Sequence, residues 1–413
     1  MILLRNCNVI NSSFLNSGKM DILIENGFIK ELGENIKSLD GYIVYDLKEF
    51  VVTPGLIDIH VHLREPGFSE KETIKTATSA ALKGGFTTLV AMPNTKPTIC
   101  DVESFRLANS LIKKKSKLNI FQSCGISVDL KGEKCVEYLN LFNEGAKLFT
   151  DDGYTTRDIN IFKKALEFSS KNDVVIMSHC EDHDESVNYL DNPTPSIIES
   201  SIVKRDIEAN KGIGGKLHLT HMSSKESVVE IRRAKFDKQK VTCDVTPHHF
   251  SLDVGQIKEF NSLYKVNPPI REKKDVDFII EAIIDGTIDI IASDHAPHEM
   301  DSKKNDYRSS SFGISGIETS FFIGYTDLVL RGKISIYRLI ELYSKNPSLL
   351  LNLDLGEIKV GKKANISVFD LSKEWIVDSN EFVSKGKNTP FNGKKLFGET
   401  KLVIVDGNVV YSI

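Results

Sequence analysis

The stretch Leu-Ile-Asp-Ile-His-Val-His-Leu-Arg, residues 56–64, determines how the rest of the chain is interpreted. Its first seven residues form an apolar, β-branched run that is typical of a buried strand. Side chains two positions apart on a strand point the same way, so His60 and His62 should project together above Asp58, with Ile57, Ile59 and Val61 facing away. Two adjacent imidazoles suit a zinc ion better than an apolar core. Because a lone His-x-His pair can also be satisfied by ordinary hydrogen bonds, the interpretation depends on the other strand ends.

Seven further apolar runs follow, and helical stretches separate most of them. The eight runs cover residues 56–62, 86–92, 120–126, 146–150, 174–179, 216–221, 241–246 and 289–293. One helix should begin after the capping-box pattern of residues 69–72 and end at Gly84-Gly85, and others are expected at 155–171, 197–211 and 224–235. This alternation predicts an α/β fold with a (β/α)8 barrel, and a doubly wound open sheet is the alternative.

The two ends of the chain are different in character. Residues 21–25, 42–45, 364–370 and 401–405 are short strand-like runs, and Asp406-Gly407 is a typical hairpin turn. Two β-rich ends of this kind can pair into one small sheet domain, a hypothesis that rests here on composition alone.

Composition narrows the class of protein. The 413 residues exceed the usual length of one domain, and 53 basic against 57 acidic residues give a net charge of −4. That balance gives no reason to expect nucleic acid or a membrane surface as a partner. Six scattered cysteines without a Cys-x-x-Cys pair favour a reducing compartment, and we expect a cytoplasmic protein. Neither a signal peptide nor an apolar run of about 18 residues is apparent.

In a (β/α)8 barrel the active site lies at the carboxyl ends of the strands. Five of the predicted strands end in metal-ligating residues: His60 and His62, Asp151 and Asp152, His179, His221, and Asp294. Four histidines with two carboxylates could hold two ions, which need a bridging anion. Adjacent strand residues face opposite ways, so one of the two neighbouring aspartates should bridge, but alternation does not decide which.

Three other histidines, His183, His218 and His249, have weaker claims. His218 shares a strand face with Thr220 rather than with His221, so we expect it to pack outside the barrel lumen.

Together these segments resemble the amidohydrolase superfamily, and within it the class I (bacterial-type) dihydroorotases, over nearly the whole chain. The resemblance is carried by residues 54–67 (PGLIDIHVHLREPG), 91–95 (AMPNT), 149–153 (FTDDG), 179–182 (HCED), 266–271 (VNPPIR), 292–298 (ASDHAPH), 312–314 (FGI) and 385–390 (KGKNTP).

The resemblance implies a distorted barrel of residues 53–350 and a small β-sandwich domain built from residues 1–52 and 351–413. It implies two zinc ions per subunit, one bound by His60 and His62 and the other by His179 and His221, with Asp152 as the bridge. Asp294 would also bind zinc and would act as general base and then general acid. The implied reaction is the reversible cyclisation of N-carbamoyl-L-aspartate to L-dihydroorotate, the third step of pyrimidine synthesis.

The substrate carries a carboxylate, for which the guanidinium of Arg64 is a suitable partner. The alternative for Arg64 is a surface salt bridge with Glu65. Asn94 can add an amide donor. The resemblance adds further substrate contacts: His62, His298, Asn267, Phe312 and Gly313. The polar stretch 299–311 has no clear period, and we expect it to act as a lid over bound substrate.

Two other functions remain as alternatives. One is a different cyclic-amide hydrolase of the hydantoinase or allantoinase type. The presence of Arg64 and Asn94, and the absence of a lysine in the bridging position, argue against it. The other is a non-catalytic scaffold of the same fold. A homodimer is the expected state, and association with aspartate transcarbamoylase is a further expectation.

Overall fold

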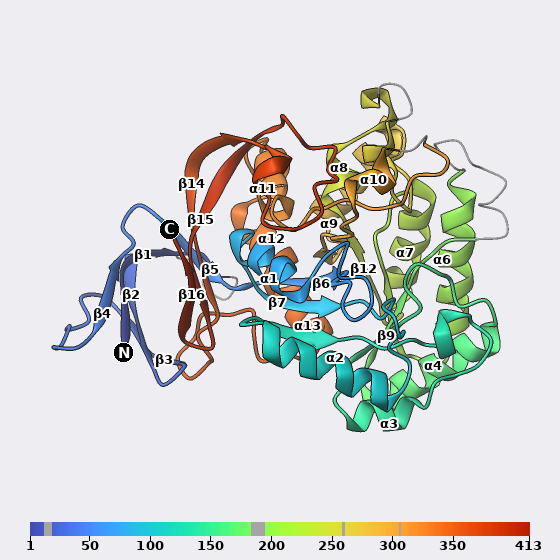
Figure 1. The fold of residues 1–413 in the computed structure, drawn as a ribbon, viewed down its shortest axis with the longest axis horizontal. Coiled ribbons are helices and arrows are strands. Elements are labelled where there is room, and N and C mark those ends of the chain that lie inside the picture. Colours follow the sequence, from blue (N-terminus) through green and yellow to red (C-terminus); the bar gives the residue numbers. More distant parts are fainter. Residues whose placement is uncertain (12–18, 183–194, 258–260, 305–306) are drawn as a thin grey trace.

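The computed structural model describes residues 1–11, 19–182, 195–257, 261–304 and 307–413. Its ribbon shows a barrel surrounded by helices, with a separate sheet on one side that carries both chain ends (Figure 1). Within the described residues, no helix combines the length and apolar character needed to cross a membrane.

In the part of the chain that the structure describes, eight parallel strands follow one another around the barrel in chain order, and each corresponds to a predicted apolar run. They are β6 (Leu56–Val61), β7 (Phe86–Ala91), β8 (Asn119–Gln122), β9 (Leu148–Thr150), β10 (Val175–Ser178), β11 (Lys216–Leu219), β12 (Val241–Val245) and β13 (Ile290–Ile291). Parallel bridges from Cys124 to Phe149 and from Val61 to His295 join β8 to β9 and close β13 onto β6. This closure confirms the barrel and excludes the open sheet.

Helices pack around the outside of the barrel, and their apolar faces share one large buried cluster with the outward side chains of the strands. They include α1 (Ile74–Lys83), α2 (Val102–Lys115), α3 (Tyr138–Asn143), α4 (Ile159–Asn172), α6 (Ile197–Asn210), α7 (Lys225–Phe236), α9 (Lys273–Asp285), α11 (Ser320–Gly324), α12 (Ile336–Ile340) and α13 (Asn346–Leu350). Two shorter helices, α8 (Pro247–Ser251) and α10 (Met300–Lys303), lie in loops at the strand ends. The predicted helices at 155–171, 197–211 and 224–235 are therefore confirmed as α4, α6 and α7.

The start of α1 differs from the prediction. Its N-cap is Thr73, which forms a capping box with Thr76, so the pattern at residues 69–72 does not cap the helix. Glu72 is instead fully buried and accepts hydrogen bonds from the backbone and hydroxyl of the 384–385 segment. The helix ends at Gly84, as the double glycine predicts.

Strand β6 does not alternate regularly, because its pairing with β7 shifts between Leu56 and Ile57 and again between Asp58 and Val61. Ile57 and Ile59 belong to a cluster with residues of β7, β9, β10 and β13 and so fill the barrel interior. Only Val61 joins the cluster that contains the buried face of α1. The expectation that all three apolar residues face away from the lumen is therefore wrong for Ile57 and Ile59.

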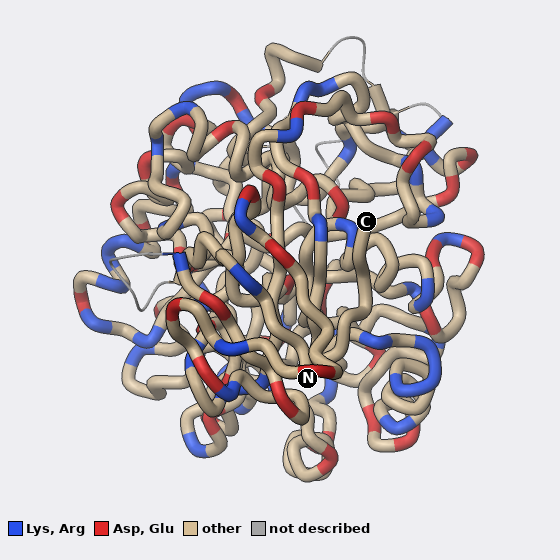
Figure 2. The backbone as a smooth tube through the Cα atoms, turned by 90° about the vertical axis from the view of Figure 1, so that its left-hand side faces the viewer, with Lys and Arg blue, Asp and Glu red and all other residues tan. Residues whose placement is uncertain are grey.

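Strands from both chain ends form one sheet, which confirms that the termini come together. Its strands are β1 (Ile2–Val9), β2 (Lys19–Glu25), β3 (Phe28–Gly33), β4 (Ile43–Asp46), β5 (Val51–Pro54), β14 (Ile366–Ile376), β15 (Lys395–Val405) and β16 (Asn408–Ser412). The two ends meet where β14 runs antiparallel to β5, with Val368 opposite Val52. On the face of the molecule that this sheet forms, acidic and basic positions are interspersed (Figure 2). The division at 52/53 and 350/351 stays a prediction.

Candidate active site

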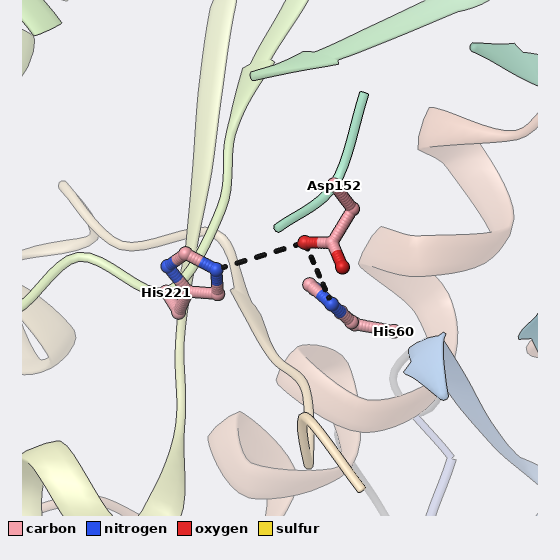
Figure 3. A group of neighbouring side chains, drawn as sticks. All are labelled: His60, Asp152 and His221. Carbon is pink, nitrogen blue, oxygen red and sulfur yellow. Dashed lines mark ion pairs between the residues drawn. The ribbon is translucent and has the colours of Figure 1, made fainter. Parts of the chain in front are cut away.

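The carboxyl ends of β6, β9 and β11 and the residues after β13 bring two carboxylates among three imidazoles. Asp152 Oδ1 lies 3.1 Å from His60 Nε2 and 4.0 Å from His221 Nε2 (Figure 3). Asp152 Oδ2 lies 3.4 Å from His62 Nε2. Asp294 Oδ1 lies 3.5 Å from His60 Nε2 and 3.2 Å from His62 Nε2. All five side chains are buried, so they form one compact polar cluster inside the barrel mouth.

Two overlapping groups in this cluster have the geometry of a metal site. They are His60 with Asp152 and His221, and His60 with His62 and Asp294, and within each group the ligand atoms lie within 4.8 Å of one another. His179 belongs to neither group, but its ring centroid is 4.8 Å from that of His221. The structure thus brings together every residue expected to bind metal, with His179 at the edge of the cluster.

The pKa values of the clustered side chains indicate that the cluster needs a positive charge. Burial lowers the pKa of His60, but Asp152 and Asp294 raise it more, to about 10. Burial raises the pKa of Asp152, yet His60 and His62 bring it well below its usual range. Burial and the neighbouring rings of His179 and His60 lower the pKa of His221. Asp152 is therefore charged, and either a proton on His60 or a metal ion must balance it.

The structure distinguishes the two adjacent aspartates. Asp151 is held away from the histidines, because its carboxylate accepts hydrogen bonds from Ser127 N (2.9 Å), Ser127 Oγ (2.7 Å) and Thr156 Oγ1 (2.9 Å). Asp152 is the one that faces the imidazoles. Its bridging role stays a prediction, and the geometry favours it over Asp151.

Arg64 lies beside the cluster, and its neighbours exclude the alternative salt bridge. Glu65 instead pairs with Lys115 at 2.7 Å and accepts the backbone N–H of Ile74 at 2.8 Å. The guanidinium of Arg64 is buried, donates from Nε to Pro297 O at 3.2 Å, and lies 3.1 Å from His298 Nε2. Burial lowers the pKa of Arg64 to about 10, so it remains charged at neutral pH.

Residues 51–410 match the sequence profile of the amidohydrolase family. The chain belongs to this family. It is 40% identical over 421 residues to a dihydroorotase of Acetivibrio thermocellus, which covers 99% of this chain and 98% of that protein. A dihydroorotase of Bacillus cereus is 39% identical and covers 97% of each chain. Within the family, the chain therefore belongs with proteins that carry the name dihydroorotase.

Solved structures confirm the fold of this amidohydrolase. An L-hydantoinase from Arthrobacter aurescens superimposes with a TM-score of 0.92 at 23% sequence identity, covering 100% of this chain and 96% of that one. A D-hydantoinase gives a TM-score of 0.89 at 22% identity. At that identity the likeness concerns the fold alone.

One prediction about the amidohydrolase barrel is wrong. His218 and Thr220 do share a strand face, but that face is the lumen, since Leu217 and Leu219 on the other face pack with the surrounding helices. The reason is that β11 ends at Leu219 and His221 has a left-handed backbone (φ 43°), so alternation no longer relates it to His218. His249 bonds through both ring nitrogens to Thr246 Oγ1 and Pro268 O, while His183 lies outside the described residues.

The residues expected to contact substrate take several positions around the mouth of the site. Asn94 Oδ1 is 2.9 Å from His62 Nδ1, so Asn94 also orients a ligand histidine. Asn267 donates a hydrogen bond to Glu181. Gly313 has φ 130°, and a side chain there would come within 2.6 Å of Ala296 O, two residues after Asp294.

Phe312 and the predicted lid occupy the outer part of the mouth. Phe312 is half exposed, with Lys265 Nζ 4.4 Å from its ring centroid. Helix α10 lies within the stretch 299–311, of which residues 305–306 are outside the described part. The lid motion stays a prediction.

Sequence reasoning missed the residues that support this site from behind. Asn388, in the motif 385–390, accepts the backbone N–H of His298 (2.9 Å) and donates to Gly313 O (2.9 Å). Glu72 holds the same C-terminal segment at its other end. The motif itself was a signal, but only the fold shows that a segment so distant in sequence reaches the barrel mouth.

Proposed function

We propose that this amidohydrolase is a zinc-dependent dihydroorotase that interconverts N-carbamoyl-L-aspartate and L-dihydroorotate. The observation that carries the proposal is the buried His/Asp cluster beside a buried guanidinium, Arg64, that has no carboxylate ion-pair partner among the described residues. The cluster supplies hydrolytic chemistry, and the guanidinium supplies a partner for a substrate carboxylate. The name shared by the relatives at about 40% identity supports the same assignment.

The donor set fits zinc. Imidazole nitrogens together with carboxylate oxygens are ordinary zinc ligands. His60 Nε2 is buried and makes no well-aligned hydrogen bond within the described structure, although the oxygens of Asp152 and Asp294 lie close by. In the proposed site, His60 and His62 would hold one ion, and His179 and His221 would hold a second. The carboxylates of Asp152 and Asp294 would complete this two-ion site. When bound, the ions supply a water whose pKa is lowered toward neutrality, which is the usual nucleophile of such hydrolases.

We assign the proton transfer to Asp294. Its Oδ1 faces the cluster 3.2 Å from His62 Nε2, and its backbone is held in a left-handed conformation (φ 44°) that aims the carboxylate into the site. In ring opening, this carboxylate accepts the proton of the attacking water and delivers it to the departing ring nitrogen. Ring closure uses the same residue in reverse.

The substrate carboxylate is assigned to Arg64 and His298. Burial and the charge of Arg64 lower the pKa of His298 to about 2, so its ring is neutral. Its Nε2 then accepts from Arg64, which puts the ring proton on Nδ1. That Nδ1 is buried and has no hydrogen-bond partner within the described structure. A bound carboxylate would satisfy both this donor and the guanidinium. Asn94, Asn267, Phe312 and Gly313 are proposed to contact the rest of the ring.

The test is a ring-opening assay on zinc-loaded wild type and Asp294→Ala. We expect turnover of L-dihydroorotate by the wild type and its loss in the variant, with circular dichroism unchanged. Asp21→Ala is the matched control, because Asp21 is also buried but lies in the terminal sheet. Equal turnover by wild type and Asp294→Ala would remove Asp294 from the mechanism, and an inactive zinc-loaded wild type would favour a scaffold.

The remaining proposals concern the assembly. We propose a cytoplasmic homodimer that can associate with aspartate transcarbamoylase. Light scattering after size exclusion tests the dimer, and co-elution with purified aspartate transcarbamoylase tests the association.

A further inference from the structure

Asp244 on β12 is a fully buried carboxylate that none of the assigned roles uses. Its Oδ2 accepts a hydrogen bond from Thr220 Oγ1 (2.8 Å) and lies 2.9 Å from His218 Nε2. Its Oδ1 accepts the backbone N–H of His221 (2.7 Å). One side chain in the barrel interior therefore contacts three residues, His218 on β11 and Thr220 and His221 in the loop beyond it.

The contact through Thr220 determines which nitrogen of His60 carries a proton. A threonine hydroxyl has one proton, and Thr220 donates it to Asp244. The 2.9 Å contact between Thr220 Oγ1 and His60 Nδ1 must then be a hydrogen bond that His60 donates. With a proton fixed on Nδ1, Nε2 is the nitrogen that faces Asp152 and that remains to bind a metal ion once it has lost its own proton.

The contact through the backbone fixes His221. Its left-handed conformation (φ 43°) is unfavourable for a residue with a Cβ and needs support from its surroundings. Asp244 gives that support twice, because its carboxylate accepts the N–H of His221 and its carbonyl accepts the N–H of Met222 (2.9 Å). One residue of the neighbouring strand thus makes two of the hydrogen bonds that hold the turn carrying the His221 ring into the cluster.

His218 holds the carboxylate itself in place. Its ring is buried and lies between Asp244 Oδ2 and Thr242 Oγ1, which is 2.8 Å from His218 Nδ1. The orientation of Asp244 is therefore set from the side away from the cluster. This gives a structural role to a lumen-facing histidine that the proposed zinc site does not use.

We propose that Asp244 is a positioning residue of the metal centre, which sets the tautomer of His60 through Thr220 and the backbone of His221 directly. It would thereby act on ligands of both proposed ions. The proposal rests on the zinc site of the proposed function.

Zinc affinity, measured by competition with a chromophoric chelator on the full-length apo protein, tests the proposal. We expect Asp244→Asn and Thr220→Val to bind zinc ~10–100-fold more weakly than wild type. Thr220→Ser keeps the hydroxyl and should restore wild-type affinity. The control is Asp21→Asn, because Asp21 is also a buried carboxylate that accepts two backbone N–H groups, from Asn6 and Ile36, far from the site. It should bind zinc normally.

A second readout separates positioning from a loss of stability. The visible spectrum of the cobalt-substituted protein reports ligand orientation, so it should change in Thr220→Val and remain unchanged in Asp21→Asn. Wild-type zinc affinity and an unchanged cobalt spectrum in Thr220→Val would overturn the proposal, and this variant decides the matter if Asp244→Asn does not fold. Zinc affinity requires no substrate. A wild type that binds zinc normally without opening dihydroorotate would therefore overturn the proposed function and leave this inference standing.

Discussion

Replacing Arg64 by glutamine tests how the substrate carboxylate is recognised. The guanidinium has five N–H donors, and its described contacts to Pro297 O and His298 Nε2 leave others for a ligand. Charge-assisted hydrogen bonds in a buried site are worth about 1.5–3 kcal/mol each, so losing two costs about 3–6 kcal/mol. At about 1.4 kcal/mol per factor of ten, kcat/KM for L-dihydroorotate should fall ~10²–10⁴-fold.

A substrate without the carboxylate provides the decisive comparison. Dihydrouracil has the same ring but no carboxylate, so Arg64→Gln should lower its turnover by less than about tenfold, a small part of the loss expected for L-dihydroorotate. Zinc content should be unchanged, because Arg64 is not a proposed ligand. Arg106→Gln is the matched control, since Arg106 is exposed and pairs with Glu144 at 2.6 Å. An equal loss on both substrates would refute the assignment of Arg64 to the carboxylate.

Asp152→Asn should remove bound zinc and activity, whereas Asp151→Asn should keep its zinc and lose about 1–3 kcal/mol of stability. Elemental analysis measures the zinc content and urea unfolding measures the stability. Loss of zinc in Asp151→Asn but not in Asp152→Asn would contradict the prediction. Zinc binding at pH 7 should release protons, because the pKa of His60 without metal is about 10 and its ring must lose a proton to ligate. Affinity should therefore rise with pH toward 10, and calorimetry in two buffers that shows no proton release would refute this. Glu72→Gln should cost about 2–4 kcal/mol of stability at pH 7. Burial raises the pKa of Glu72, but His295, Ser384 and Thr76 lower it more, so the pKa is lowered overall. The contribution of the Glu72 carboxylate to folding stability is therefore present at neutral pH and is lost as the pH falls through this lowered pKa. A difference between wild type and Glu72→Gln that grows in acid would contradict the sign.

The barrel and most of its polar strand ends could be predicted from the sequence because both follow from local patterns. Each strand is a short apolar run, and the residues that end it, such as His60 and Asp294, are of types that an apolar core does not tolerate without partners. No local signal predicts that β13 closes onto β6. The closure is implied only by the number of such runs, because eight of them suit a closed barrel.

What the sequence did not settle depends on departures from regular strand geometry. The register shifts in β6 turn Ile57 and Ile59 inward, and the left-handed backbone of His221 breaks the alternation used to place His218. The choice of Asp152 over Asp151 needed Ser127, from a different loop, to be brought alongside. Long-range contacts of this kind leave no periodic trace in the sequence.

The most direct test of the central claim is the ratio of kcat/KM for L-dihydroorotate to kcat/KM for hydantoin on the zinc-loaded wild type. Hydantoin offers a cyclic amide to the same cluster but no carboxylate to Arg64 and His298. We therefore predict a ratio far above one. A ratio below one would contradict the assignment and favour a hydantoinase.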